Sequence, residues 1–419
     1  MKKVLKPADI VVEEPSLQLV LSKYMKRELR DFVFEQGRIA LWQMLEDERT
    51  VLCGPAYERG VKGPKRSGST RGRLVMGGRR ITVKRPRVRG DDGDLTLPSL
   101  VAFAQDDPLD KRALEQMILG VSTRKYHRSL EEVPKDLSAS GTSKSAVSRR
   151  FVAATRKQLA EFLLRPLGPL DLAVILIDGI VIDKHVVVLA IGIDHEGDKH
   201  VLGFWEGATE NTATCQALLE NLMKRGLDAH RSFLFVIDGS KALRKAIDNT
   251  FGKRALVQRC QVHKMRNVLA HLPKEMQSSI RQLMREAYKS SSHDVAARRL
   301  KQTAAQLEEE YPSAAASLRE GLAETLTVMR LGLSPLLRRT LASTNIIENL
   351  NSSVRTTTGR VKRWKGGRMI LRWSAAAVLE AESKFRRIRG HKDMKTLVSF
   401  LSQHQKHIEE ELDQPREAA

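Results

Sequence analysis

Two aspartates in the middle of the sequence stand in the same local setting. Asp178 and Asp238 each follow a strongly apolar run, and each lies in the tripeptide Ile-Asp-Gly, at 177–179 and 237–239. A carboxylate beside a buried strand is costly unless it is paired or binds a cation, and the following glycine lets a ligand approach the backbone. If the two strands are neighbours, these like charges require a cation, and oxygen ligands favour Mg²⁺ or Mn²⁺. The alternative is that each aspartate closes a turn.

A third acid is needed for two-metal phosphoryl transfer, and Glu348 in the segment STNIIENL is the candidate. Asn345 and Glu348 are also spaced as an N-terminal capping box, in which the carboxylate reaches back to the cap. The residues alone do not separate capping from catalysis. Asp183 and Asp194 lie near the same strands, but each is expected in a turn, which accounts for both without a metal.

Cys260 and His263 in QRCQVHKMRNVL are spaced Cys-x-x-His, which is half of a common zinc motif. A structural zinc site needs four ligands, and Cys53 and Cys215 have no cysteine or histidine pair beside them to complete it. A cysteine nucleophile with a histidine base is disfavoured as well, because residues three apart at a strand end seldom reach the geometry that this chemistry needs.

The elements that must position these residues follow from the hydrophobic pattern. From Leu170 onward, β-branched runs predict three antiparallel strands, a helix, a buried strand ending at Asp238, a second helix and a fifth strand. Residues 271–340 are rich in Ala, Leu, Glu and Arg at helical spacing. We therefore expect an α/β fold with a mixed sheet, interrupted by an all-helical insertion. Trp205, on the third strand, is expected in the core.

The N-terminal part of the sequence contains a basic segment, which follows one helical region and precedes another. Apolar positions in 16–52 predict two helices with a break near Gly37. Residues 56–90 hold 12 Lys and Arg and one acid, with short strands expected at Arg73–Met76 and Arg80–Lys84. Such a block of almost entirely positive charge favours an arm that follows the DNA backbone, and a solvated linker is the alternative.

A helix-turn-helix pattern follows this arm. A short helix in STRKYHRSLEEVP, a Gly/Ser turn and a second helix capped by Thr142 or Ser143 are typical of that motif. Its second helix would present Lys144, Ser148 and Arg149 to DNA. Many helical hairpins of this kind bind nothing, so the pattern leaves both alternatives open.

The charge balance indicates a polyanionic partner. The 419 residues contain 72 Lys and Arg against 50 Asp and Glu, a net charge of +22, and neutralising phosphates releases counterions and drives binding. Residues 355–373 include no acid and interleave Trp364 and Trp373, which predicts phosphate contacts with base stacking; a solvated face with buried tryptophans is the alternative. The residues expected to contact DNA are Lys144, Ser148, Arg149, Arg259, Lys264, Arg266, Arg355, Arg360, Lys362, Arg363, Lys365 and Arg368.

Three scattered cysteines are too few for a disulfide framework and fit a reducing compartment. The N-terminus shows no apolar core or cleavage site of a signal peptide, and no run approaches the length of a membrane span. We expect a cytoplasmic protein with no membrane partner.

Four segments together resemble the Mutator-type transposases of bacterial insertion sequences: ILIDGI around Asp178, FVIDGS around Asp238, RCQVHKMRNVLAHLP and STNIIENLNSSVRTTTGR. The segments YHRSLEEV, GTSKSAVSRRF and VKRPRVRG extend the resemblance over most of residues 70–390. The resemblance implies a ribonuclease-H-like catalytic domain with an Asp-Asp-Glu triad, in which Asp178 and Asp238 match the aspartates and Glu348 matches the glutamate.

The resemblance also implies a function. It implies a DNA transposase that binds the terminal inverted repeats of an insertion sequence, cleaves DNA with two Mg²⁺ (or Mn²⁺) ions per active site, and joins the freed 3′-hydroxyl to target DNA. It implies a bacterial homodimer that is nucleoid-associated when bound to double-stranded DNA. Within it we expect Cys260 and His263 to order the site or to contact flanking DNA. A catalytically silent DNA-binding derivative and a ribonuclease-H-like nuclease without strand transfer are the alternatives.

The pattern and the resemblance together predict the following division of the chain. The expected segments are an N-terminal helical segment (1–55), a basic Gly-rich arm (56–100), a helical DNA-binding domain (101–166), the two parts of the catalytic domain (168–270 and 341–390), the helical insertion (271–340) and a tail (391–419).

Overall fold

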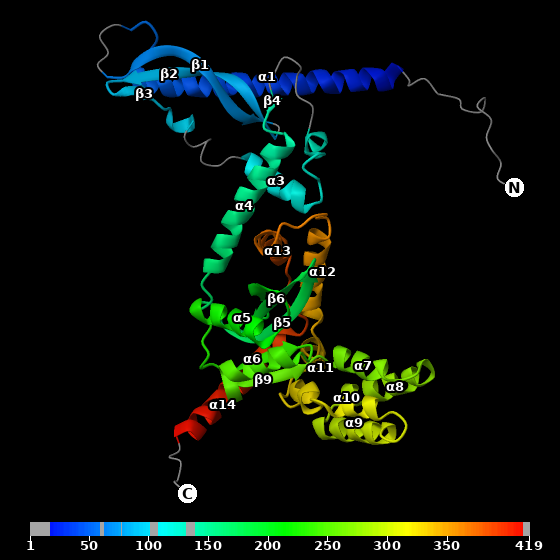
Figure 1. Cartoon of the computed structure of the whole chain (residues 1–419). Coiled ribbons are helices and arrows are strands. Elements are labelled where there is room, and N and C mark those ends of the chain that lie inside the picture. Colours follow the sequence, from blue (N-terminus) through cyan, green and yellow to red (C-terminus); the bar gives the residue numbers. More distant parts are fainter. Residues whose placement is uncertain (1–16, 59–62, 77, 101–107, 131–138, 414–419) are drawn as a thin grey trace, which may run out of the picture. The chain divides into compact units, whose positions relative to one another are not determined.

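The computed structural model describes residues 17–58, 63–76, 78–100, 108–130 and 139–413 (Figure 1). Contacts within the chain divide it into two units, Met1–Ala154 and Thr155–Ala419. None of the helices in the described ranges is long and apolar enough to cross a membrane.

The first unit begins with one long helix, α1 (Leu17–Cys53). The expected break near Gly37 is therefore wrong, because a single glycine costs a helix only about 1 kcal/mol. On one side α1 packs against β2 (Arg79–Gly90) through a small core that contains Leu45 and Val88. On the other side, Met25, Leu29 and Phe32 are exposed.

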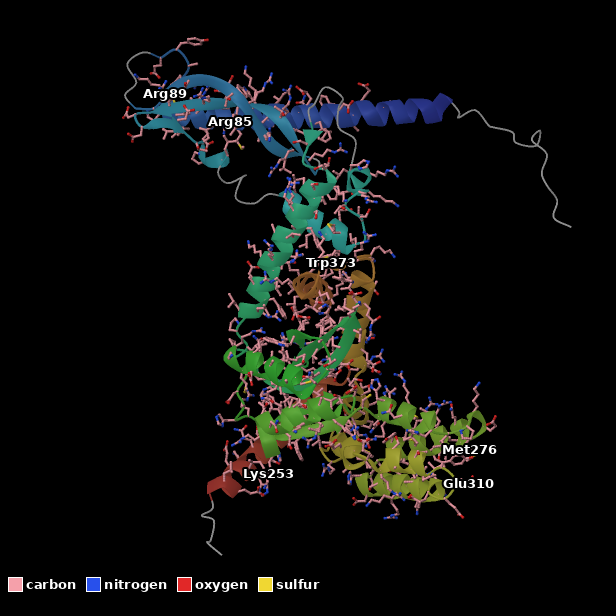
Figure 2. All side chains as sticks on the ribbon, in the orientation of Figure 1. Arg85, Arg89, Lys253, Met276, Glu310 and Trp373 are labelled. Atoms are coloured by element: carbon pink, nitrogen blue, oxygen red, sulfur yellow. The ribbon has the colours of Figure 1, made fainter. Side chains whose placement is uncertain are left out.

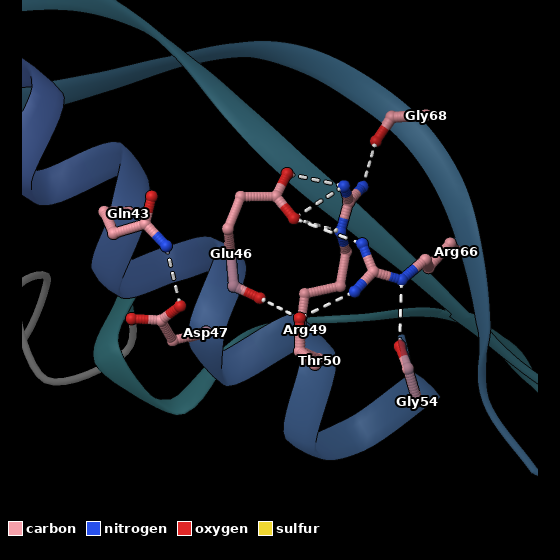
Figure 3. A network of polar contacts seen from close by, with 8 residues as sticks. All are labelled: Gln43, Glu46, Asp47, Arg49, Thr50, Gly54, Arg66 and Gly68. Atoms are coloured by element: carbon pink, nitrogen blue, oxygen red, sulfur yellow. Dashed lines mark hydrogen bonds and ion pairs between the residues drawn. The ribbon is translucent and has the colours of Figure 1, made fainter. Parts of the chain in front are cut away.

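The basic arm forms a long hairpin beside α1. Strand β1 (Lys65–Met76) pairs antiparallel with β2, and the short strands β3 (Gly93–Leu95) and β4 (Ala139–Ser140) also pair with β2. Both long strands exceed the ranges expected from the sequence. Figure 3 shows how the hairpin is fastened to the helix: Arg66 of β1 donates to the hydroxyl of Thr50 at 2.6 Å and pairs with Glu46 at 3.2 Å. Figure 2 shows Arg85 and Arg89 on β2.

The helix-turn-helix prediction is confirmed in its second helix only. Helix α3 (Pro108–Ile118) precedes a short 3₁₀ turn, η2 (Tyr126–Ser129), where a helix was expected. Residues 131–138 lie outside the described residues. Helix α4 (Lys144–Leu164) begins after Ser143, whose hydroxyl accepts the Ala146 N–H at 3.3 Å as the expected cap.

The second unit is built on a five-stranded mixed sheet, in the order β7-β6-β5-β8-β9. The expected meander is confirmed, since β5, β6 and β7 pair antiparallel, while β8 runs parallel to both β5 and β9. The strands and the helices between them are β5 (Leu172–Ile182), β6 (His185–Asp194), β7 (Lys199–Gly207), α5 (Thr212–Lys224), β8 (Phe233–Ile237), α6 (Lys241–Phe251), η3 (Gly252–Arg254) and β9 (Ala255–Arg259).

Helices cover both faces of this sheet because its central strands are apolar on both sides. On one face, Leu218 of α5 and Ile247 of α6 pack against Ile175 and Phe235. On the other face, Leu350, Val378 and Leu397 pack against Leu176 and Val236. The helices on that second face are α12 (Asn345–Thr358), α13 (Gly367–Glu382) and α14 (Met394–Asp413), with the 3₁₀ turn η5 (His391–Asp393) before α14.

The segment between β9 and α12 is all helical, as its composition predicts. It contains α7 (Gln261–Ala270), α8 (Lys274–Lys289), α9 (His293–Leu307), α10 (Pro312–Arg319), η4 (Ala323–Met329) and α11 (Pro335–Leu341). Most of these helices share a core of their own, with Met284, Leu300 and Leu318 at its centre. Figure 1 shows α7 to α10 gathered beside the sheet.

Candidate active site

Asp178 and Asp238 lie on neighbouring parallel strands. Strand β5 pairs with β8 through Val174 and Leu234, and through Leu176 and Val236. The same register places Asp238, directly after β8, level with Asp178. Asp178 therefore lies within β5, four residues before its end, and pairing of the two strands brings it beside Asp238, which follows the end of β8.

The Asp178 carboxylate is held by two hydrogen bonds. Its Oδ1 accepts the Gly179 N–H at 3.0 Å, and its Oδ2 accepts Nδ2 of Asn351 at 2.7 Å. Burial and the negative charge of Asp238 raise the pKa of Asp178 to about 7, Glu210 adds to the rise, and the Gly179 hydrogen bond and His263 oppose it. The site thus holds more negative charge than its surroundings compensate.

Asp238 lies in a tight loop between β8 and α6. Its Oδ1 accepts the Ser240 N–H at 2.9 Å, and Gly239 adopts a φ of 115°, which favours glycine. This is the turn role that Asp-Gly often plays. The carboxylate nevertheless lies close enough to Asp178 and His263 to influence the pKa of both.

Glu348 lies in the first turn of α12 and does not form the capping box. The N-cap of α12 is Thr344, not Asn345, and no side chain caps it. The Thr344 hydroxyl instead donates to Glu348 Oε1 at 2.8 Å. Since Asn351 follows Glu348 by three residues, both lie on the helix face that is turned toward Asp178.

Cys260 and His263 lie at the start of α7, next to Glu348. The Cys260 N–H donates to the Ile237 carbonyl at 2.8 Å, and the Thr344 N–H donates to Cys260 Sγ at 3.4 Å. His263 Nδ1 lies 3.3 Å from Thr344 Oγ1 and 3.9 Å from Glu348 Oε1. These contacts tie the loop that follows β9 to the beginning of α12.

The surroundings of Cys260 and His263 shift the pKa of each side chain in opposite directions. Burial raises the pKa of the Cys260 thiol, but hydrogen bonds with His263 and Thr344 outweigh it and leave that pKa below its ordinary value. The hydrogen bond to Cys260 raises the pKa of His263 against the effect of burial, and the charges of Glu348 and Asp238 raise it further.

The carboxylates and the Cys-x-x-His pair form one continuous site. Ligand atoms of Cys260, His263 and Glu348 all lie within 4.8 Å of one another, whereas in the described part of the chain Asp178, Asp238 and Glu348 form no group this tight. His263 and Asn351 connect the two aspartates to the glutamate. Cys260 and His263 alone fall short of the four ligands of a structural zinc site, and Glu348 adds a third donor atom beside them.

With this geometry in place, comparison with known proteins assigns the chain. A model of the family described as "Transposase, Mutator family" matches residues 14–387. The chain belongs to the Mutator family of transposases.

Curated relatives of this Mutator-family chain are transposases of insertion sequences. It is 28% identical over 330 residues to the transposase for insertion sequence element IS256 in transposon Tn4001 of Staphylococcus aureus, covering 75% of this chain and 80% of that protein. It is 27% identical over 364 residues to the transposase for insertion sequence element ISRM5 of Rhizobium meliloti (strain 1021), covering 85% and 89%.

Three residues of the candidate site were not predicted from the sequence. Thr344 and Asn351 are buried polar residues of the segment around Glu348, and their spacing on a helix was the available signal. Glu210 stands before α5, where its charge affects Asp178. No local pattern marks it, because only the fold brings it near.

The basic residues expected to contact DNA divide into two groups. Arg259 and Lys264 are 8% and 2% exposed. Arg259 donates to the Gly239 carbonyl at 3.0 Å, and Lys264 Nζ donates to the carbonyls of Ser317 and Glu320 at 2.7 and 2.6 Å. Both therefore brace the protein and leave the DNA-contact set. The exposed members are Lys144, Ser148, Arg149, Arg266, Arg355, Arg360, Lys362, Arg363, Lys365 and Arg368.

The predictions for the tryptophans and for Asp183 and Asp194 agree with the structure to different degrees. Trp373, labelled in Figure 2, is 7% exposed, and Trp364 is partly buried against the same core. The Trp373 ring is therefore not exposed for the expected stacking on a DNA base. Trp205 is 37% exposed, so the expectation that it lies in the core is wrong, because β7 is an edge strand. Asp183 lies in a turn as expected, and Asp194 ends β6, where its carboxylate accepts the N–H groups of Glu196 and Asp198 in the turn that follows.

Proposed function

We propose that the chain is a DNA transposase that binds the terminal inverted repeats of an insertion sequence, cleaves a DNA strand and transfers the freed 3′-hydroxyl to target DNA. The observation that carries this proposal is the pair of aspartates, together with their link to the helix that bears Glu348. Asp178 and Asp238 are level on neighbouring strands, and Asn351, one turn beyond Glu348, holds Asp178. The names of the relatives as insertion-sequence transposases support it.

We propose that residues 168–270 and 341–390 form a ribonuclease-H-like catalytic domain. Three antiparallel strands followed by two parallel ones, with helices on both faces, support this assignment. We propose residues 271–340 as its insertion, 1–55 as a helical segment, 56–100 as a DNA-tracking arm and 101–166 as a DNA-binding domain.

Residues Asp178, Asp238 and Glu348 would hold Mg²⁺ or Mn²⁺, two ions per site. Their donors are carboxylate oxygens, which these ions prefer. Burial and the charge of Asp238 raise the pKa of Asp178, and a bound cation would compensate the charge of the ionised carboxylate. Bound ions would stabilise the charge that develops on the phosphate during an in-line displacement.

The protein's own groups would hold these carboxylates in place. Asn351 fixes Asp178 Oδ2, and Thr344 fixes Glu348 Oε1. Cys260 positions Thr344 by accepting its N–H, and His263 lies beside Glu348, with Nδ1 3.9 Å from Oε1. This assigns Cys260 and His263 to positioning of the site.

Exposed cations at three places would bind the DNA. One group lies at the end of α12 and the start of α13, a second lies at the start of α4, where a helix N-terminus also favours phosphate, and Arg266 on α7 is the third. Because two element ends must be brought together, we propose a homodimer.

The test is cleavage and joining of a labelled duplex taken from the end of the element that carries this gene. With Mg²⁺, the wild type should cleave it, and Asp178→Asn, Asp238→Asn and Glu348→Gln should each lower the rate by about 100-fold or more, since each removes transition-state charge stabilisation. The matched control is Asp183→Asn, because Asp183 has a φ of 55° in an exposed turn that asparagine also tolerates.

The outcomes separate the alternatives. Equal cleavage by the wild type and all three variants would refute the triad. Cleavage without joining to a second duplex would identify a nuclease, and binding of the element end without cleavage in either Mg²⁺ or Mn²⁺ would identify a silent DNA-binding derivative.

A further inference from the structure

Two helix beginnings meet beside the carboxyl edge of the sheet, and three unlike donor atoms converge there. Cys260 precedes α7, His263 lies in its first turn, and Glu348 lies in the first turn of α12. Cys260 Sγ, a ring nitrogen of His263 and a carboxylate oxygen of Glu348 all lie within 4.8 Å of one another. In the catalysis proposed above, the metal ions bind to carboxylate oxygens. Of these three residues, only Glu348 would therefore take part directly.

We propose that Cys260, His263 and Glu348 form a binding site for a soft divalent cation of the Zn²⁺ class, and that its occupation switches the transposase off by withdrawing Glu348 from catalysis. The ion site rests on the geometry of the three side chains. Its inhibitory effect rests on the function proposed above for Glu348.

The donor set selects the ion. Thiolate, imidazole and carboxylate are all zinc ligands, whereas Mg²⁺ takes oxygen ligands. Tetrahedral Zn²⁺ with ordinary bond lengths places neighbouring donor atoms about 3.5 Å apart. His263 Nδ1 and Glu348 Oε1 are already 3.9 Å apart, so the cluster closes around the ion with side-chain movements of about 1 Å.

One buried residue holds all three donors in place. Thr344 is fully buried, its N–H lies 3.4 Å from Cys260 Sγ, and its hydroxyl lies 2.8 Å from Glu348 Oε1 and 3.3 Å from His263 Nδ1. Its contacts already hold these side chains side by side, so little ordering remains to be done when an ion binds.

Charge and access also favour this ion. Zn²⁺ with one thiolate, one carboxylate and one neutral imidazole has no net charge, which limits the cost of holding it in a half-buried place. The Cys260 thiol releases its proton to solvent as the Zn–S bond forms. Cys260 is buried, but the side chains of His263 and Glu348 are 26% and 31% exposed, so the ion enters from their side. Three protein ligands leave a fourth position for water.

The direct test uses Co²⁺ as a coloured probe on the full chain, stripped with a chelator and kept in excess Mg²⁺ to fill oxygen sites. The expected result is one Co²⁺ per chain, with a thiolate-to-cobalt absorption band that Zn²⁺ abolishes. Cys53→Ser/Cys215→Ser, which keeps only Cys260, should retain the band, because Cys53 and Cys215 lie in separate hydrophobic clusters.

Loss of the ligands should weaken Co²⁺ binding. Cys260→Ser should lose the band, and His263→Gln, which keeps the thiol, should bind Co²⁺ more weakly by about 100-fold or more, since each variant removes one of three protein ligands. A wild type without the band overturns the proposal. So does a band that survives Cys260→Ser, or one that disappears in Cys53→Ser/Cys215→Ser.

The switch is tested by strand cleavage. In excess Mg²⁺, one equivalent of Zn²⁺ should reduce cleavage by the wild type and by Cys53→Ser/Cys215→Ser at least tenfold, and a zinc chelator should restore it. Unchanged cleavage with Zn²⁺ bound at Cys260 overturns the switch. A chain that cleaves nothing in Mg²⁺ alone contradicts the proposed function, and the cobalt band, which is read without DNA, then still decides the ion site.

Discussion

Asn351 Nδ2 donates a 2.7 Å hydrogen bond to Asp178 Oδ2 and so joins helix α12 to strand β5. The side chain of Asn351 is 1% exposed, and its Oδ1 has no hydrogen-bond partner among the described residues. An amide kept in this costly setting indicates a role beyond packing. It links the strand of the first catalytic candidate to the helix of the third.

Asn351→Ala should lower strand cleavage about 10- to 100-fold, the usual cost of removing a residue that orients a metal ligand. DNA affinity should stay unchanged, because the side chain is buried. Gel-shift and cleavage assays on one preparation separate the two effects. Asn349→Ala, on the exposed face of the same helix, is the matched control and should cleave like the wild type. Equal rates for the two variants would show that Asn351 is dispensable.

The stability of the ion-free protein should depend on Asp178 and pH. The pKa of this carboxyl is raised from 3.8 to about 7, so the folded state keeps a proton that the unfolded state loses between those values. The protonated Asp178 therefore contributes stability that is fully present below about pH 4 and is lost as the pH rises to about 7. Asp178→Asn should increase the free energy of unfolding by an amount that grows over this range, up to about 4 kcal/mol.

Urea unfolding in the presence of a chelator, at pH values from 5 to 8, measures this difference. Mg²⁺ should stabilise the wild type at pH 8 and have little effect on Asp178→Asn. If Asp178→Asn were less stable than the wild type at pH 8 without ions, the buried charge of Asp178 would not be what destabilises the ion-free protein.

Lys264 and Arg266 lie two residues apart on α7 and should behave oppositely. Lys264→Met leaves the carbonyls of Ser317 and Glu320 without their donor, so unfolding should become easier by about 1–3 kcal/mol. Its DNA affinity should be unchanged where it is folded. Arg266→Ala should change stability by less than about 0.5 kcal/mol and weaken DNA binding. If DNA binding by Lys264→Met depended less on salt than binding by the wild type, Lys264 would be a phosphate contact and its structural role would be wrong.

The basic segment between α12 and α13 should contact phosphates. Arg363→Ala/Lys365→Ala should weaken binding to any duplex, and the slope of log affinity against log salt should become shallower by about two, one for each lost contact. The control is Lys301→Ala, an exposed lysine of the helical insertion. If both variants lose affinity equally, DNA binding is diffuse and does not follow this segment.

The sheet could be predicted from sequence because its strands are buried on both faces. Runs such as the one ending at Asp178 have no polar alternation, and only a covered strand tolerates this. Predictions failed where pairing or packing outweighed local preference. Gly37 did not break α1, and the expected tail from residue 391 forms α14, which is fixed by Leu397 and Leu401 in the core.

The site was predictable in part for a similar reason. Asp178 and Asp238 are conspicuous because a carboxylate seldom follows a strongly apolar run, although β5 continues past Asp178 to Ile182. Glu348 needed the family resemblance to distinguish it from a capping residue. Thr344 and Asn351 could not be singled out, because a polar residue in a helix becomes notable only when packing turns it toward another group. Arg259 and Lys264 were misjudged since charge alone does not reveal burial.

The two ends of the helical insertion meet at its base, where the Gln261 N–H donates to the Ala342 carbonyl at 3.0 Å and the Thr344 N–H donates to Cys260 Sγ at 3.4 Å. The chain thus leaves and re-enters the α/β layers at a single point, and the three acids fall on opposite sides of that excursion. A backbone cut in the turn at Ser291, between α8 and α9, would leave both aspartates on one fragment and Glu348 on the other. The insertion's own core, in which Met284 of α8 packs with Leu300 of α9, would then hold the two fragments together.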